Sequence, residues 1–141
     1  MKTLASLWLV HDKSRLLLAI MDKLAGNAHI SFEGNLSNLG LLRFPGASEE
    51  ATGVLKRNTL WPKQDFIVVP LESSMSKAIL SAIGGVVPRK IIHIQVEKAS
   101  ILEFGAYDNF SPGCVFFGSA VGQELIESLV SQGVLNSKPN A

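Results

Sequence analysis

The sequence predicts one α+β domain, with a mostly antiparallel or mixed sheet of about five to six strands and about three helices packed on one face. Its 141 residues, 47% of them hydrophobic, suffice for one core and leave little room for a second. Three segments show the apolar spacing of amphipathic helices, and the strand-like segments do not alternate with them as in a doubly wound parallel fold. We therefore assign residues 1–135 to a single globular domain and residues 136–141 to a flexible C-terminal tail.

The chain opens with a predicted strand and helix. The apolar run at residues 4–10 does not alternate, which is typical of a short strand covered on both faces. A helix follows, because apolar residues recur on one helical face between a capping Asp12 or Ser14 and a stop at Gly26. These apolar residues are Leu17, Ile20, Met21 and Leu24.

A second strand and a long connection come next. Residues 28–33 alternate as a strand does and reach Gly34-Asn35, a pair suited to a tight hairpin turn. A return strand through residues 39–41 is therefore expected. From residue 45 to residue 63 the apolar period fades, which predicts a long loop of the kind that often carries function.

The continuous apolar run at residues 66–71 predicts a central strand with Pro70 at its end. A second helix should begin at a capping Ser73 or Ser74 and end at Gly84-Gly85, where glycine adopts the left-handed conformation without steric cost. Its expected buried stripe is Met75, Ile79, Ala82 and Ile83.

Residues 91–107 predict a β-hairpin that turns at residues 98–100. Pairing Glu97 with Ile101 produces an apolar ladder on one face. The paired residues are then Ile94 with Phe104 and Val96 with Leu102. A slip of two residues would place Glu97 opposite Glu103, an unfavourable like-charge pair, so the first register is predicted.

The C-terminal part predicts one more strand and a last helix. The strand covers residues 114–117, and the helix should begin at Ser119 or Ala120 and stop at Gly133. The helix residues expected to face the core are Val121, Leu125, Leu129 and Val130.

Composition restricts the function classes. Thirteen Lys and Arg residues against twelve Asp and Glu leave a net charge of +1 without any like-charge block, which disfavours a dedicated nucleic-acid binder. The single Cys114 excludes an intramolecular disulfide and indicates a reducing cytoplasm. No metal or cofactor is expected, because the histidines fall in separate elements and no glycine-rich phosphate motif occurs. No apolar segment is long enough to span a bilayer, so no membrane partner is expected.

One candidate site lies on the polar face of the predicted hairpin. There His93 is diagonal to Glu103 and Tyr107, and a histidine oriented by a carboxylate can transfer protons. The alternative interpretation is an ordinary solvated sheet face. A nucleophilic Cys114 assisted by His93 lacks a cysteine-enzyme signature, and the thiol is expected to be a small buried hydrophobe.

A second candidate surface comes from two loops. Residues 107–113 are rich in side chains that hydrogen-bond in turns, and residues 56–63 interleave cations with an aromatic ring. The binding residues predicted from them are Tyr107, Asp108, Asn109, Phe110, Arg57 and Trp61. In the alternative interpretation the Asx residues bond their own backbone, and Phe110 and Trp61 are hydrophobic plugs.

The leading hypothesis is a small non-enzymatic interaction or ligand-binding protein, such as an immunity-like or accessory partner protein, that acts as a homodimer. A mean hydropathy of +0.27 supports self-association, because it indicates more apolar surface than a monomer of this size hides. The alternative is a small enzyme that uses His93, Glu103 and Tyr107 for proton transfer. A weaker alternative is single-stranded nucleic-acid binding through the loop from Lys56 to Lys63.

Overall fold

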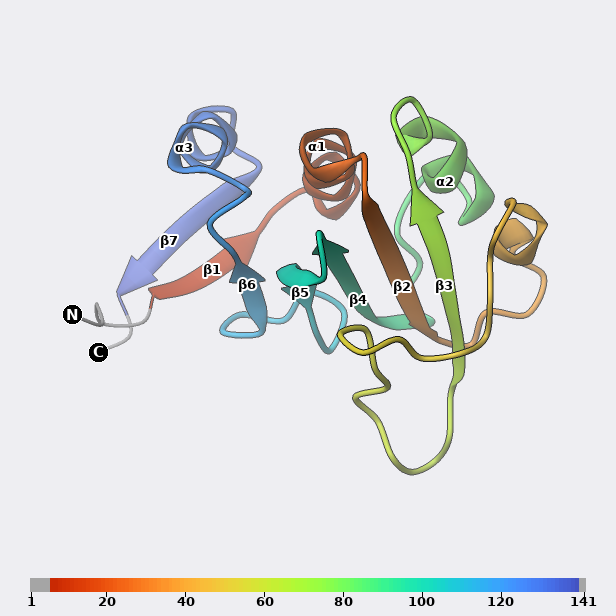
Figure 1. Ribbon diagram of the computed structural model, residues 1–141. Coiled ribbons are helices and arrows are strands. Elements are labelled where there is room, and N and C mark those ends of the chain that lie inside the picture. Colours follow the sequence, from red (N-terminus) through yellow and green to blue (C-terminus); the bar gives the residue numbers. More distant parts are fainter. Residues whose placement is uncertain (1–5, 140–141) are drawn as a thin grey trace.

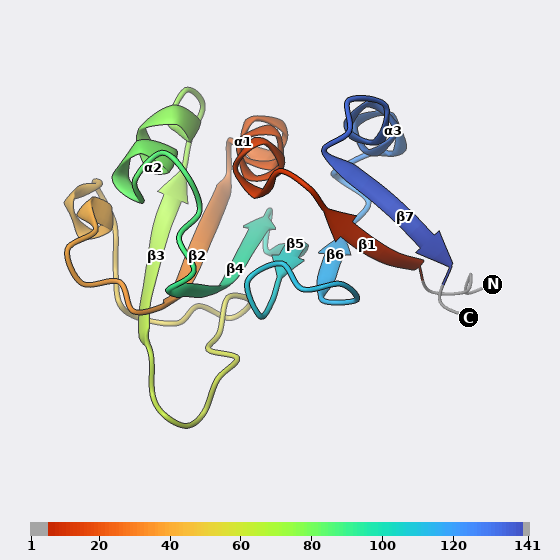
Figure 2. The same cartoon turned by 180° about the vertical axis from the view of Figure 1, so that it is seen from behind.

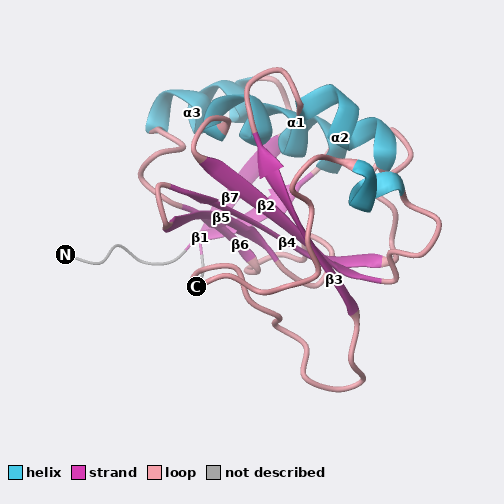
Figure 3. Cartoon of the chain, turned by 45° about the vertical axis from the view of Figure 1, so that its right-hand side comes forward, coloured by secondary structure: helices cyan, strands magenta, loops and turns pink. Residues whose placement is uncertain are grey.

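The computed structural model of the protein describes residues 6–139 and confirms the α+β class. In chain order the elements are β1 (Ser6–Val10), α1 (Lys13–Leu24), β2 (Ala28–Gly34), the 3-10 helix η1 (Gly40–Arg43), β3 (Asp65–Leu71), α2 (Ser76–Ala82), β4 (Ile91–Lys98), β5 (Ile101–Ala106), β6 (Val115–Phe117), α3 (Gln123–Ser131) and β7 (Leu135–Pro139). A five-stranded antiparallel sheet has the order β3-β2-β4-β5-β6, and β1 pairs with β7 in a second sheet (Figure 1). The three helices lie together over one side of the strands (Figure 3).

The main core lies between these helices and the sheet. α1 begins where predicted, because the Asp12 side chain accepts a hydrogen bond from Arg15 N at 3.1 Å. Its predicted apolar face is fully buried. The end of α1 is closed by Lys98 of β4, whose Nζ donates to the carbonyl groups of Leu24, Ala25 and Gly26 at 3.0, 3.1 and 2.6 Å. A cation at the C-terminus of a helix also complements the helix dipole.

The hairpin of β4 and β5 forms in a register different from the one predicted. Val96 pairs with Phe104, which is the slipped alignment, and a β-bulge lies between Val96 and Glu97. Glu97 pairs with Leu102, so Glu103 is the extra residue of the bulge and the two carboxylates do not pair. The apolar ladder survives only in part. Val96 still pairs with the apolar Phe104 in the main core, but beyond the bulge Leu102 pairs with Glu97 and packs against the second cluster formed by Leu55, Phe66 and Val68.

The turn explains this register. The strands close at the pair Lys98 and Ile101, so the turn has two central residues instead of the three assumed from the sequence. Both of them, Ala99 and Ser100, have positive φ angles of 51° and 66°. Two-residue turns with this backbone match the twist of antiparallel strands and are the common hairpin connection.

Two other expectations about the sheet are wrong. The return strand through residues 39–41 is replaced by η1, whose Leu41 is fully buried in the main core. The apolar run of β3 forms an edge strand instead of a central one. Its apolar side chains are still buried on both faces, because Ile67 and Val69 join the main core and Val68 packs under the loop that precedes β3.

The C-terminal segment also differs from its prediction. Residues 136–139 belong to β7 and pair antiparallel with β1, whereas residues 1–5 and 140–141 lie outside the described part of the chain. A flexible tail was predicted for residues 136–141, but the backbone of residues 136–139 pairs with β1. The preceding α3 begins at Gln123, later than expected, so Ile126 faces the core while Val130 is 40% exposed.

The two-stranded sheet is joined to the rest of the molecule through aromatic packing. Seen from behind, β1 runs beside β6 (Figure 2). Trp8 of β1 packs edge-on against Phe117 of β6, with ring centroids 5.4 Å apart. The backbone of His11 also donates to Val134 O at 2.8 Å, which connects the end of β1 to the start of β7. The second sheet therefore extends the same core.

Candidate functional site

The second face of the five-stranded sheet is covered by the long loop between η1 and β3. This loop crosses in front of the lower ends of the strands in Figure 1. Its Leu55 is fully buried and forms a small second core with Phe66 and Val68 of β3. The polar side chains that were expected in solvent are consequently buried beneath it. They are Glu33, His93 and Gln95, which hydrogen-bond to the loop. Ser31, Glu97 and Glu103 are also buried, with Glu97 and Glu103 held by contacts outside the loop.

The loop projects from this face as a finger, which we define as residues 56–64. Its tip carries Leu60 and Trp61, which are 89% and 86% exposed and are the most exposed large hydrophobic side chains of the described residues. The interpretation of Trp61 as a hydrophobic plug is therefore wrong. Neither side chain packs on the protein, so nothing in the fold accounts for an apolar tip.

The base of the finger is fixed by Glu33 of β2. This carboxylate is 1% exposed and accepts hydrogen bonds from Asn58 N at 2.8 Å and from Thr59 N at 3.1 Å. Gln95 of β4 adds a further contact, because its Nε2 donates to Lys56 O at 2.9 Å. Bonds to a charged acceptor are stronger than neutral ones, so the two sheet residues hold the finger backbone in one position.

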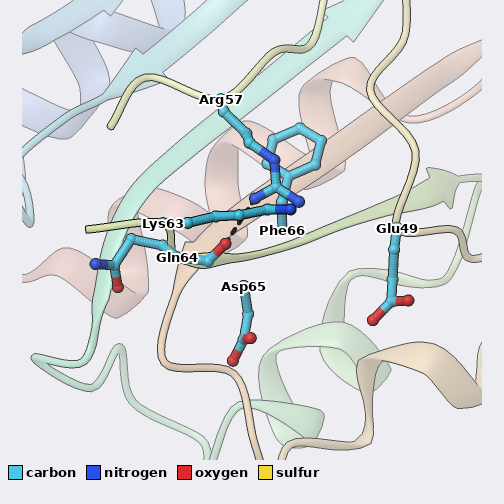
Figure 4. A pocket seen from close by; sticks show the side chains of 6 residues that line it. All are labelled: Glu49, Arg57, Lys63, Gln64, Asp65 and Phe66. Atoms are coloured by element: carbon cyan, nitrogen blue, oxygen red, sulfur yellow. Dashed lines mark hydrogen bonds between the residues drawn. The ribbon is translucent and has the colours of Figure 1, made fainter. Parts of the chain in front are cut away.

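Arg57 closes the finger on its other side. Its guanidinium donates to Gln64 O at 2.6 Å and lies over the Phe66 ring at 5.2 Å from the ring centroid. An open pocket of about 300 Å³ adjoins it, lined by Glu49, Arg57, Lys63, Gln64, Asp65 and Phe66. Figure 4 shows the ends of Arg57 and Lys63 directed to the same region, while the carboxylates of Asp65 and Glu49 point elsewhere. Asp65 accepts from Leu36 N at 2.9 Å, which fixes it beside β2.

His93 connects the finger to the second predicted loop, residues 107–113. Its Nδ1 accepts a hydrogen bond from Asp108 N at 3.1 Å, so the ring proton of the neutral imidazole sits on Nε2. Nε2 then donates to Thr59 Oγ1 at 2.8 Å. His93 is 6% exposed. The structure thus brings the two predicted binding segments together, with His93 between them.

The proton-transfer group predicted from the sequence is only partly assembled. The His93 and Tyr107 rings lie with centroids 5.5 Å apart. Glu103 makes its contact elsewhere, because its Oε1 accepts from Ala120 N at 3.0 Å in the segment before α3. Both nitrogens of His93 are occupied by the loops that it joins. Cys114 Sγ faces Asp108 Oδ2 at 4.0 Å, which is a carboxylate and not a histidine base.

A histidine and carboxylate pair does exist, between His29 of β2 and Glu97 of β4, which were not predicted to lie together. His29 Nδ1 lies 2.5 Å from Glu97 Oε2, and the other oxygen of Glu97 accepts from Ser100 N at 2.9 Å. His29 and Glu97 face each other across β2 and β4. The alternation of each strand indicated that both are on the polar face, but the pairing of these two strands is visible only in the fold.

Tyr107 covers the backbone of Gly105. A Cβ atom at Gly105 would lie 2.6 Å from the Tyr107 hydroxyl oxygen, so the ring packs where only glycine leaves space. The hydroxyl donates to Gln95 Oε1 at 3.3 Å. Burial raises the pKa of the Tyr107 hydroxyl, because the charged phenolate is disfavoured away from water.

The remaining residues of the 107–113 loop have mainly structural contacts. Asp108, Asn109 and Phe110 all have positive φ angles, between 51° and 63°. Asn109 bonds to Pro88 O and Ile91 O through Nδ2, and Lys13 donates to its Oδ1. Phe110 is 4% exposed within the main core and packs near Phe104, so it is not available to a ligand. Of these three residues only Asp108 is exposed, and Pro112 is exposed further along the loop.

Comparison with known families, with curated proteins and with solved structures yields no match for this chain. Within residues 6–139, no three His, Cys, Asp or Glu side chains gather as a metal site requires. None of the helices in the described range has the length and apolar character needed to cross a bilayer.

Proposed function

We propose that this protein is a small non-enzymatic interaction protein and that the finger is its contact surface. The observation that carries the proposal is the exposure of Leu60 and Trp61, 89% and 86%, at the tip of a loop whose base is hydrogen-bonded to the sheet. Tryptophan is enriched among the residues that dominate binding energy at interfaces. A tip held in place before binding loses little conformational entropy when a partner covers it.

The contacts of His93 support an interaction role over proton transfer. A general base needs a free nitrogen directed at a substrate, whereas both nitrogens of His93 bind the loops beside it. We assign His93 the role of positioning the finger relative to the 107–113 loop.

Photo-crosslinking tests the proposed contact. Replacing Trp61 with p-benzoylphenylalanine places a photoreactive ring at the tip, and the same replacement of Val86, which is 64% exposed after α2, is the matched control. We expect an adduct from position 61 and none from position 86 when the protein is irradiated in the cells that make it. The mass of the adduct tells whether the partner is a second copy, another protein, a lipid or a nucleic acid. Equal labelling at both positions, or none at position 61, contradicts the proposal.

Single-stranded nucleic-acid binding is a second candidate, and one observation favours it. The exposed Trp61 ring lies in the same finger as Lys56, Arg57 and Lys63, and proteins that bind single strands combine stacking aromatics with cations. Quenching of Trp61 fluorescence by oligothymidylate at low salt, and its reversal by added salt, is the expected result if this function holds.

A further inference from the structure

We propose that the partner of the finger is an anionic phospholipid membrane. Leu60 and Trp61 enter the interfacial layer, and the exposed Lys56 and Lys63 contact the headgroups. This inference rests on the proposed function, because it names the partner of the same loop. It departs from the expectation drawn from the sequence, where no membrane contact was predicted, because the exposure of the tip is a property of the folded chain.

The charge of the finger is the first argument. Residues 51–64 contain Lys56, Arg57 and Lys63 and no Asp or Glu, although the whole chain carries only +1. Glu49, Glu50 and Asp65 flank this segment, so the positive charge is confined to the finger itself, beside the apolar tip. Glu49 and Asp65 share the pocket with Arg57 and Lys63, but among residues 6–139 neither forms an ion pair with these cations. Basic residues next to an inserted apolar group are the pattern that binds anionic membrane surfaces.

The residues at the tip are the second argument. Tryptophan is enriched at membrane interfaces, where its ring sits at the level of the headgroups. Leu60 projects beside it with almost no contact to the protein. An aliphatic side chain gains nothing from stacking on a nucleic-acid base, whereas it gains from transfer out of water into the acyl boundary. The pair of side chains therefore favours a lipid layer over single-stranded nucleic acid.

The size of the apolar surface is the third argument. Leu60 and Trp61 together present roughly 350 Å², from the area that such side chains bury. A stable protein interface buries about 800 Å² on each partner. A tip of this size is too small for a stable homodimer on its own, but a membrane needs no complementary surface. The finger fits a reversible membrane contact that depends on both charge and insertion.

Vesicle binding of the purified full-length chain tests the inference. Vesicles of phosphatidylcholine mixed with phosphatidylserine are compared with vesicles of phosphatidylcholine alone, by co-sedimentation and by tryptophan emission. We expect a blue shift and binding only with phosphatidylserine, weakened by added salt. Acyl chains carrying bromine should quench the shifted emission. In Trp61→Phe the remaining Trp8 should give neither the shift nor the quenching.

Matched variants separate charge from insertion. Lys56→Gln and Lys63→Gln remove exposed cations that make no side-chain hydrogen bond within the described residues, and each should weaken binding about fivefold. Lys77→Gln on α2 is the charge control and should bind as the unmodified protein does. Leu60→Ser and Trp61→Ser should each weaken binding at least about tenfold. Val86→Ser removes an apolar side chain that is 64% exposed elsewhere on the surface and should bind normally.

The outcomes distinguish this inference from the proposed function. Acrylamide quenching without vesicles, compared between the unmodified protein and Trp61→Phe, measures the exposure of Trp61 directly. If Trp61 is exposed but phosphatidylserine vesicles leave its emission unchanged, the membrane inference is overturned and the proposed function stands. If Trp61 is shielded in the free protein, both fall. Vesicle binding that survives Trp61→Ser also overturns the inference. The inference is likewise overturned if the emission of Trp61 responds to oligothymidylate or to self-association but not to phosphatidylserine vesicles.

Discussion

Glu33 offers the most direct test of how the finger is held. Its buried carboxylate accepts two backbone hydrogen bonds, from Asn58 at 2.8 Å and Thr59 at 3.1 Å. Each bond to a charged acceptor contributes about 1.5–3 kcal/mol. Glu33→Ala removes both, but the two amides then regain water, so we expect a net loss of about 2–4 kcal/mol in the free energy of unfolding. Glu33→Gln keeps one acceptor oxygen and should lose about 1–2 kcal/mol.

Two measurements check this expectation. Urea unfolding gives the free energy for each variant, and hydrogen exchange gives the protection of the Asn58 and Thr59 amides. Both amides should exchange fastest in Glu33→Ala, more slowly in Glu33→Gln and slowest in the unmodified protein. Glu49→Ala is the matched control, because Glu49 is an exposed glutamate, and it should change stability by less than about 0.5 kcal/mol. If Glu33→Ala costs no more than this control and leaves both amides protected, the finger is held by other contacts and the reasoning is wrong.

Three further predictions concern the packing around the site. Tyr107 is the only tyrosine, so absorbance at alkaline pH reports it alone, and burial should raise its pKa above the ordinary value of about 10. The folded protein then keeps this proton to a higher pH than the unfolded chain does, so the stability that Tyr107 contributes is present below about pH 10 and is lost as pH rises through the folded pKa. Tyr107→Phe should remove this part of the alkaline loss of stability. A Tyr107 that titrates at the ordinary pKa would contradict the burial argument. Gly105→Ala should lower the free energy of unfolding by about 1–3 kcal/mol in thermal unfolding, because its Cβ would meet the Tyr107 ring. The control Gly53→Ala should be neutral, because its Cβ meets no atom within 4 Å. Equal effects of the two substitutions would contradict the packing of Tyr107 on Gly105. Lys98→Met should lower the free energy of unfolding in urea by about 1–2 kcal/mol, because it removes three hydrogen bonds from the end of α1. The amides of the last helical turn should also exchange faster with solvent. Unchanged exchange of these amides would show that the Lys98 cap is not needed.

Local sequence signals located most elements where they lie in the fold. The capping Asp12, the apolar period that follows it and the stop at Gly26 depend on residues within one or two helical turns, so α1 was predicted closely. The hairpin of β4 and β5 was also predicted, because alternation fixes which face each side chain occupies. Its register was not. The register depended on a two-residue turn and on a bulge at Glu103, which local alternation does not encode.

The candidate site was only partly predictable for a related reason. The residue types of both loops were identified, including Arg57, Trp61 and Asp108, because cations, aromatics and turn formers are visible in the sequence. Their accessibility was not visible. Phe110 entered the core while Trp61 remained outside it, although both are aromatic residues in loops. Burial depends on what other segments cover, which residue type alone does not determine.

The sequence by itself determined the α+β class, the identity of most elements and the separation of apolar from polar side chains along β4, since these follow from interactions between near neighbours. Only the tertiary structure decided that β2 lies between β3 and β4, that β7 completes a second sheet with β1, and that the long loop covers the polar face. Those pairings join residues far apart in the chain, as Glu33 joins Asn58 and His93 joins Thr59 and Asp108. Once the sheet face was covered, Glu33 and Gln95 needed partners, and the loop backbone supplied them. The same contacts left Leu60 and Trp61 directed into solvent.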